Sequence, residues 1–140
     1  MKYVMYLLSI LLLSSCLAEK NDIELAQRSS EKYYDFMKAK KVDSIIYLCD
    51  KIFFAETDTS ILLGALNSIQ SDHGNIVSHQ LIRTETTNSI DNGKTENKLV
   101  LTYQAVYSSG YTAKESFRFY IEKGYTGKIG GFRTEKWKDK

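Results

Sequence analysis

Two periodicities divide the chain at Gly74. Before it, apolar residues recur every three or four positions, as in Ile23, Ala26, Tyr33 and Met37, which is typical of one face of a helix. After it, apolar and polar residues alternate with the period of two that predicts strands. This order predicts three helices followed by an antiparallel meander, an α+β domain.

The helical half divides into three segments. The first has Asn21 as its expected N-cap and ends near residue 41. The second runs from Asp43 to Phe53, and the third begins between residues 57 and 59 and ends before Gly74. The apolar positions expected to face the core from the third helix are Ile61, Leu62, Ala65, Leu66 and Ile69.

The second half predicts four strands. The first covers residues 76–87, and Asp91-Asn92-Gly93 is a strong hairpin turn signal before the second. A turn at Ser108-Ser109-Gly110 leads into the third strand, and the fourth runs over 126–137 with a bend at Gly130-Gly131. The side chains expected on the inner side of the second and third strands are Leu99, Leu101, Tyr103, Ala105, Tyr107, Phe117 and Phe119.

The first sixteen residues follow neither pattern. Lys2 precedes an apolar run of about ten residues, too short for the ~20 that a membrane-spanning helix needs. The run ends at Leu13-Ser14-Ser15-Cys16, which resembles the lipobox of bacterial lipoproteins. We therefore expect a signal peptide at 1–15, a lipidated cysteine and short tether at 16–21, and a single domain at 22–138.

The resemblance to lipoproteins implies that Cys16 becomes an acylated N-terminus. Two or three acyl chains hold a protein on a membrane, whereas one chain binds only reversibly. Leu17 stands where an aspartate retains enterobacterial lipoproteins at the inner membrane, which favours the outer membrane, with the domain facing the periplasm or the exterior. The alternative is an ordinary secretory signal that leaves a cysteine near the new end.

The charge balance and the few cysteine and histidine residues exclude several classes of function. The 140 residues include 19 basic and 17 acidic ones, and this balance excludes a field that attracts nucleic acid. Cys49, the other cysteine, follows an apolar stretch that favours a small buried hydrophobe over a nucleophile. His73 and His79 are too isolated to predict a metal site or a triad, and we expect them at the surface or as caps.

Order and pattern together resemble a known family. The entry into the sheet at Gly74-Asn75-Ile76-Val77-Ser78, the strand Leu99-Val100-Leu101-Thr102-Tyr103 and the closing segment Gly127-Lys128-Ile129-Gly130-Gly131-Phe132 resemble small NTF2-like (cystatin-like, cone-shaped) bacterial lipoproteins of unknown function. The resemblance implies a long helix packed across a strongly bent sheet, whose concave face frames a pocket in many relatives.

The predicted function is that of a non-enzymatic binding or interaction module. Tyr103, Tyr107 and Phe119 are the expected ligand-binding residues, with the alternative that they simply fill the core. Their ligand is either a small apolar molecule or a segment of an envelope protein. Glu115 and Glu122 are expected near strand ends or on the outward side, which argues against catalysis, so no catalytic residue, cofactor or metal is predicted.

Three alternatives remain at this stage. One is an NTF2-like isomerase or hydrolase whose acid and base groups are distant in sequence. The second is an immunity-type inhibitor of a secreted toxin. The third is a homodimer formed through the open sheet face.

Overall fold

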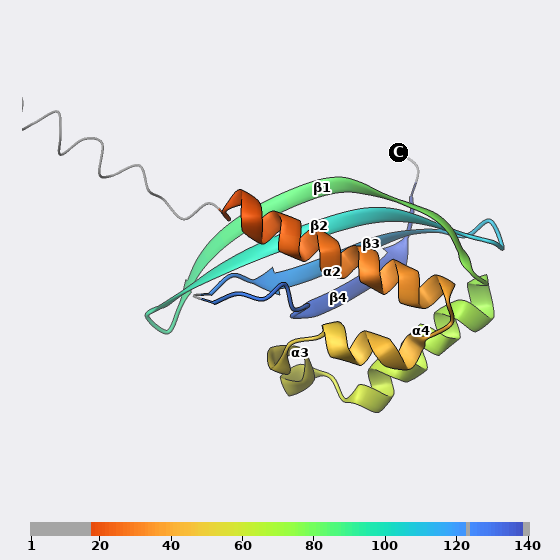
Figure 1. The fold of residues 1–140 in the computed structure, drawn as a ribbon, viewed down its shortest axis with the longest axis horizontal. Helices are drawn as coiled ribbons and strands as arrows, with labels where there is room; N and C mark the ends of the chain where they lie inside the picture. The colour runs from red at the N-terminus through yellow and green to blue at the C-terminus, as the bar shows by residue number, and fades with distance from the viewer. Residues whose placement is uncertain (1–17, 123, 139–140) are drawn as a thin grey trace, which may run out of the picture.

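Four antiparallel strands form one curved sheet, and the longest helix lies across its concave face (Figure 1). The computed structural model describes residues 18–122 and 124–138. The strands lie side by side in chain order, so each connection joins neighbours. Their bounds are β1 Ile76–Asp91, β2 Lys94–Tyr107, β3 Thr112–Tyr120 and β4 Gly131–Lys136. The predicted α+β fold, with helices before a four-stranded antiparallel sheet, is confirmed.

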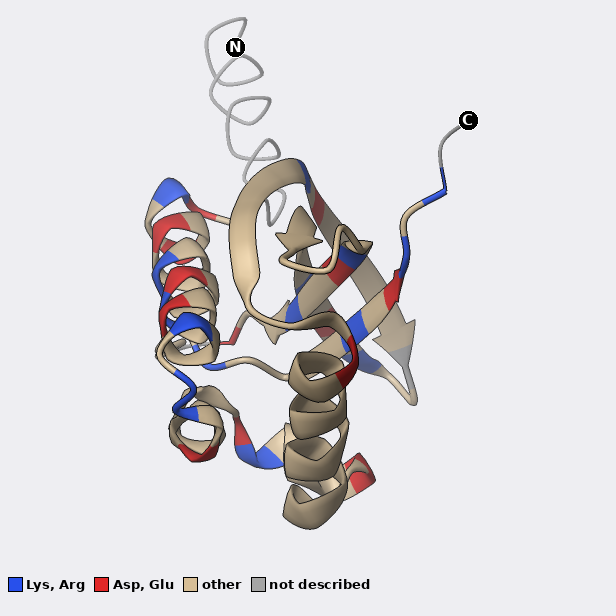
Figure 2. Cartoon of the chain, turned by 90° about the vertical axis from the view of Figure 1, so that its right-hand side faces the viewer, with Lys and Arg blue, Asp and Glu red and all other residues tan. Residues whose placement is uncertain are grey.

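Helix α2 (Lys20–Lys38) begins earlier than predicted. Its N-cap is Glu19, whose backbone N–H donates to the Asp22 carboxylate at 3.2 Å, so the predicted cap at Asn21 is wrong. Asn21 with Glu24 and Glu19 with Asp22 both have the spacing of a capping box, and the structure forms the earlier one. Acidic and basic residues are interspersed along α2 (Figure 2). No helix among the described residues is long and apolar enough to span a membrane.

The predicted second helix, Asp43 to Phe53, is two elements. A 3₁₀ helix, η1 (Val42–Leu48), is followed by the short helix α3 (Lys51–Glu56). Between them Cys49 is extended and forms a parallel bridge with Ile129. The N–H of Ile129 donates to the Leu48 carbonyl at 2.8 Å, and its own carbonyl accepts from the Asp50 N–H at 2.8 Å. This long-range pairing interrupts the helix that local spacing predicts.

Helix α4 (Thr59–His73) has the predicted bounds. Asp58 is its N-cap and accepts from the Ser60 N–H at 2.7 Å, and Gly74 ends it with φ +80°. The expected core face is partly wrong: Leu62 and Leu66 are buried, but Ile61 is 65% exposed and Ala65 is exposed as well. The helix carries almost no charge (Figure 2) and packs against η1 along a narrow apolar stripe.

Strand β1 is longer than predicted and is interrupted twice. Pairing with β2 shifts at Val77 and again at Ile82, so each is an extra residue of the β-bulge kind. After each bulge, the positions that face the core change from odd-numbered to even-numbered residues or the reverse. This explains why apolar and polar residues alternate poorly over 76–87. The hairpin turn is confirmed, since Asn92 and Gly93 have φ +48° and +77°, the signature of a type I′ turn.

The predicted fourth strand is half as long in the structure. Residues 126–130 lie outside the sheet ladder apart from the Cys49–Ile129 bridge, and β4 begins at Gly131. The Tyr120 ring occupies the place of a side chain at Gly130, because a Cβ there would lie 2.4 Å from it. The chain therefore bends at the predicted glycines, and only the part after the bend pairs with β3.

The core lies between α2 and the concave face of the sheet. The inner residues predicted for β2 and β3 are buried, which confirms their register. They pack against Tyr33, Tyr34 and Met37 of α2. Phe117 lies at the centre, with ring centroids 5.0 Å from Tyr33, 5.7 Å from Tyr103 and 5.1 Å from Phe132.

Gly127 brings the segment after β3 against α2. Its φ is +79°, and a Cβ there would lie 2.9 Å from the Leu25 carbonyl oxygen. Gly110 has φ +85° with no atom within 4 Å of such a Cβ, so it is a matched control. Both alanine variants carry the left-handed backbone penalty of about 1–2 kcal/mol. We expect Gly127→Ala to lose about 1 kcal/mol more than Gly110→Ala in urea unfolding, because only it pushes on the α2 backbone. Equal losses would contradict this.

Candidate functional site

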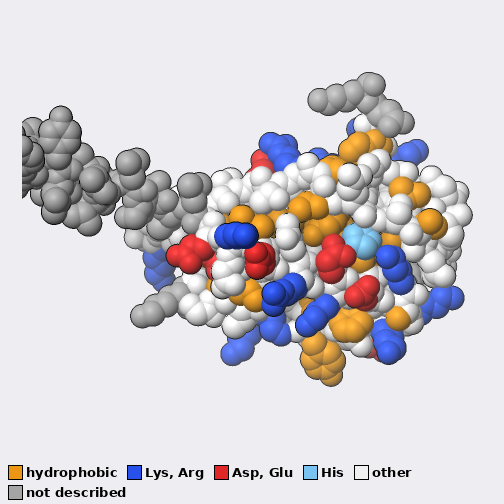
Figure 3. All heavy atoms as spheres, turned by 45° about the horizontal axis from the view of Figure 1, so that its top comes forward, with side chains coloured by type: hydrophobic (Ala, Val, Ile, Leu, Met, Phe, Trp, Pro, Cys, Tyr) orange, Lys and Arg blue, Asp and Glu red, His pale blue; other side chains and the backbone are white. Residues whose placement is uncertain are grey.

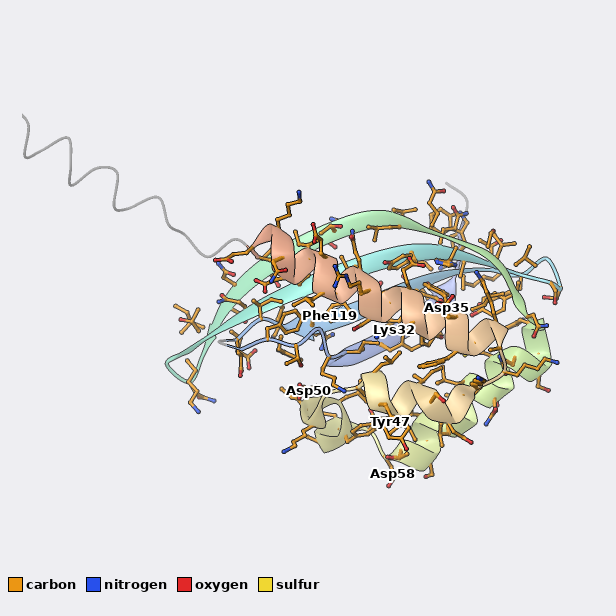
Figure 4. All side chains as sticks on the ribbon, in the orientation of Figure 1. Lys32, Asp35, Tyr47, Asp50, Asp58 and Phe119 are labelled. Carbon is orange, nitrogen blue, oxygen red and sulfur yellow. The ribbon has the colours of Figure 1, made fainter. Side chains whose placement is uncertain are left out.

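The predicted ligand-binding residues belong to the packed interior. Tyr103 and Tyr107 are each 1% exposed and Phe119 is 0% exposed. Figure 4 places Phe119 among the side chains between α2 and the sheet. A hollow in this core, lined in part by Tyr33, Cys49 and Phe117, has a volume of about 10 Å³. A water molecule needs roughly 10–15 Å³, so this hollow holds no organic ligand as it stands.

Glu115 corrects the prediction that no acidic residue points inward. It is 0% exposed, and it faces the interior from β3 between the inward Ala113 and Phe117. The Tyr107 hydroxyl donates to its Oε1 at 2.5 Å. Burial raises the pKa of Glu115, while the hydroxyls of Tyr107 and Tyr34 oppose the shift. Glu115 lies two positions before the inward Phe117, so strand alternation places both on the same side. This spacing is the sequence signal that could have revealed an inward carboxyl group.

His79 is the neighbour of this buried carboxylate on β1. Its ring stacks on Tyr34 with centroids 3.9 Å apart, and its Nε2 lies 2.7 Å from the Glu31 carboxylate. The side chain is 13% exposed, so His79 is more buried than the surface or capping position expected for it. His73, at the end of α4, stacks on Tyr111 at 3.7 Å. No group of three or more metal-ligating side chains occurs within the described ranges.

A buried acid beside tyrosine hydroxyls can transfer a proton only to a substrate that reaches it. Glu115 and Tyr107 are covered by the packed side chains of α2 and the sheet. General acid–base catalysis requires the substrate within hydrogen-bond distance of the acid, and packed side chains of the described residues cover Glu115 in this structure. The Tyr107 hydroxyl, held by its hydrogen bond to Glu115, is fixed in orientation within the core.

Cys49, expected as a small buried hydrophobe, is a half-buried free thiol. Its Sγ donates to the Ile45 carbonyl at 3.5 Å. Burial raises its pKa to about 11, although Lys128 partly counters this. The thiol is therefore protonated at neutral pH and unsuited to act as a nucleophile.

A larger hollow lies on the outer face of the sheet, the side turned away from α2. This outer-face pocket has a volume of about 480 Å³, within the range of small-molecule sites. Strands β2, β3 and β4 form its floor, and α3 forms a wall. Its lining residues are Phe53, Glu56, Thr57, Val100, Lys114, Ser116, Arg118, Gly130, Gly131, Phe132, Arg133 and Glu135.

Charge in the outer-face pocket is unevenly paired. Glu135 accepts from Lys114 at 2.9 Å and from Arg133 at 3.2 Å, and these cations lower its pKa. Arg118 has no carboxylate within ion-pair distance among the residues that the structure describes. The sequence analysis missed this pocket, because its residues alternate as ordinary outward polar positions and only the pairing of β3 with β4 brings them together.

Two further predictions fall outside the described part of the chain. The signal peptide at 1–15 and the lipidation site Cys16 belong to residues 1–17. Comparison with known proteins adds no family: no family model matches the chain, and no curated protein matches it.

Proposed function

We propose that this protein is a bacterial lipoprotein of the cell envelope, anchored by acyl chains on Cys16 and located at the outer membrane. The leader pattern that ends at Leu13-Ser14-Ser15-Cys16 supports this. Helix α2 starts at Lys20, so three residues lie between Cys16 and the helix. Three residues span about 10 Å when extended, so the anchored domain would lie close to the membrane surface.

We also propose that the domain is NTF2-like. The helix-first order, the curved meander and the placement of α2 across the concave face support this relationship. The interior differs from the hollow cone that binds apolar molecules in many members, because aromatic rings from α2, β2 and β3 occupy it.

The proposed activity is non-enzymatic binding at the outer-face pocket. The observation that carries this is the contrast in volume between the core hollow, about 10 Å³, and the outer-face pocket, about 480 Å³. A protein partner would favour a contiguous apolar face, whereas the exposed large apolar side chains lie scattered on η1, α3, α4 and β1. Acidic and basic side chains are likewise interspersed over the face seen in Figure 3. A small ligand therefore fits the outer face better than a protein.

The Cys16→Ser variant tests the anchor. We expect the wild-type chain, expressed with its leader, to partition into membranes and detergent and to yield an acylated N-terminal cysteine in mass spectrometry. Without a thiol to modify, Cys16→Ser should lose this acylation. Cys49→Ser is the matched control and should partition like the wild type. A wild-type product that stays in the aqueous phase with an unmodified thiol would overturn the anchor.

A further inference from the structure

We propose that the outer-face pocket binds a small organic anion, with the anionic group on Arg118 and the apolar body against Val100. This inference rests on the proposed binding function and names the chemical class of its ligand. Three cations line the pocket against two carboxylates, Glu56 and Glu135. The pocket therefore has a net positive charge in addition to its apolar walls.

Pairing within the pocket singles out Arg118. Lys114 and Arg133 share the Glu135 carboxylate, so each of them already has a carboxylate partner. Glu56, the other lining carboxylate, is not within ion-pair distance of Arg118. The exposed guanidinium keeps its fork of N–H donors available, and that fork matches the two oxygens of a carboxylate or phosphate.

The backbone positions this guanidinium inside the pocket. Arg118 pairs with Gly131 on β4 and with Val100 on β2, so it projects from the middle of the outer face. A Cβ at Gly131 would lie 3.5 Å from the Arg118 Cβ and 3.9 Å from its Cζ. The Arg118 side chain therefore lies beside Gly131, in space that a larger side chain at position 131 would also need. This holds the charge along the floor of the pocket.

The remaining lining explains the apolar part of the ligand. Val100 supplies hydrocarbon surface on the floor and Phe53 on the α3 side, and the Ser116 hydroxyl, 3.3 Å from the Thr102 hydroxyl, adds a polar contact on the floor. A neutral ligand would cover the guanidinium without pairing it, and a cation would be repelled. Both therefore bind less well than an anion of the same shape.

Benzoate, benzyl alcohol and benzylamine test the charge requirement with one ring. Each is titrated into the full-length protein in nonionic detergent micelles, and binding is measured from amide chemical shifts of Val100, Ser116 and Gly131. We expect benzoate to bind at least ten-fold more tightly than the other two. We expect Arg118→Gln to weaken benzoate binding about ten-fold or more, because the charge-assisted hydrogen bonds from the guanidinium to the carboxylate are lost. Arg118→Lys should give an intermediate loss.

Arg83→Gln is the matched control. Arg83 lies on β1, pairs with Glu85 at 2.7 Å and does not line the pocket, so its loss should leave benzoate affinity unchanged. Circular dichroism melting of each variant establishes that the fold is retained. If benzyl alcohol binds as tightly as benzoate at these amides, the proposed preference for anions is wrong, whereas the proposed binding function of the outer-face pocket still holds. If no probe shifts them, both the inference and binding at the outer face fail, whereas the anchor is tested separately through Cys16.

Discussion

Phe117→Ala is expected to destabilise the protein by about 3–5 kcal/mol, the usual cost of removing a buried aromatic ring. The ring is completely buried and contacts those of Tyr33, Tyr103 and Phe132. Its removal leaves a cavity that α2 and the sheet would have to shift to fill. Because whole-domain stabilities are about 5–15 kcal/mol, this loss takes a large fraction of the total.

Urea unfolding monitored by circular dichroism measures this effect. Phe117→Leu is the control that keeps most of the apolar volume, and we expect it to lose less than about 1.5 kcal/mol. If Phe117→Ala unfolds at nearly the same urea concentration as the wild type, the interior is less tightly packed than described. A pocket among Tyr103, Tyr107 and Phe119 would then deserve renewed tests as a ligand site.

Glu115→Gln is expected to remove a pH dependence of stability. Burial raises the pKa of Glu115 in the folded protein, so the folded chain holds this proton more tightly than the unfolded chain. Its contribution to stability is therefore fully present below the unfolded pKa, about 4.3, and is lost as the pH rises through the higher folded pKa. The wild type should lose stability relative to Glu115→Gln over this range.

Denaturant unfolding of both proteins between pH 4 and pH 8 measures the difference. Tyr33, Tyr34 and Tyr107 face the carboxyl group, and their pKa values are raised by burial, so they do not titrate in this range. His79, which interacts electrostatically with Glu115, is present in both proteins, so the difference between the curves reports Glu115 together with its interaction with His79. Parallel curves would show that the carboxyl group is solvated.

Glu115→Ala separates the charge from the hydrogen bond. Glutamine keeps an acceptor for the Tyr107 hydroxyl, whereas alanine leaves it buried without one. We expect Glu115→Ala to be about 1–3 kcal/mol less stable than Glu115→Gln at neutral pH. If the two variants are equally stable, the hydroxyl finds another partner and the acid has no structural role.

Local patterns were sufficient for most of the fold. Asn92-Gly93 marked the hairpin, Asp58 and Gly74 bounded α4, and alternation identified the inner side of β2. These features depend on the conformational preferences of a few adjacent residues. The predictions failed where distant segments pair, as at Cys49 and Ile129, where the bridge divides one expected helix into η1 and α3.

The candidate site shows the same division. The sequence singled out Tyr103, Tyr107 and Phe119 as a pocket wall or as core, and periodicity cannot distinguish a lined cavity from a filled one. The inward carboxylate of Glu115 was readable from its parity with Phe117 but was assigned to the strand end. The outer-face pocket was not readable at all, because Arg118 and Arg133 lie fifteen positions apart and become neighbours only through the β3–β4 ladder.

By itself the sequence determined the order of helices and strands, the inner register of β2 and the leader pattern that predicts a membrane anchor at Cys16. Each follows from neighbouring residues, through backbone preferences and the spacing of apolar side chains. Tertiary structure alone decided that the core is packed, that Glu115 lies among tyrosines and that Arg118 has no carboxylate within ion-pair distance in the described part of the chain. Those outcomes depend on volumes and distances between side chains that only the packing of α2 and α3 against the sheet brings together.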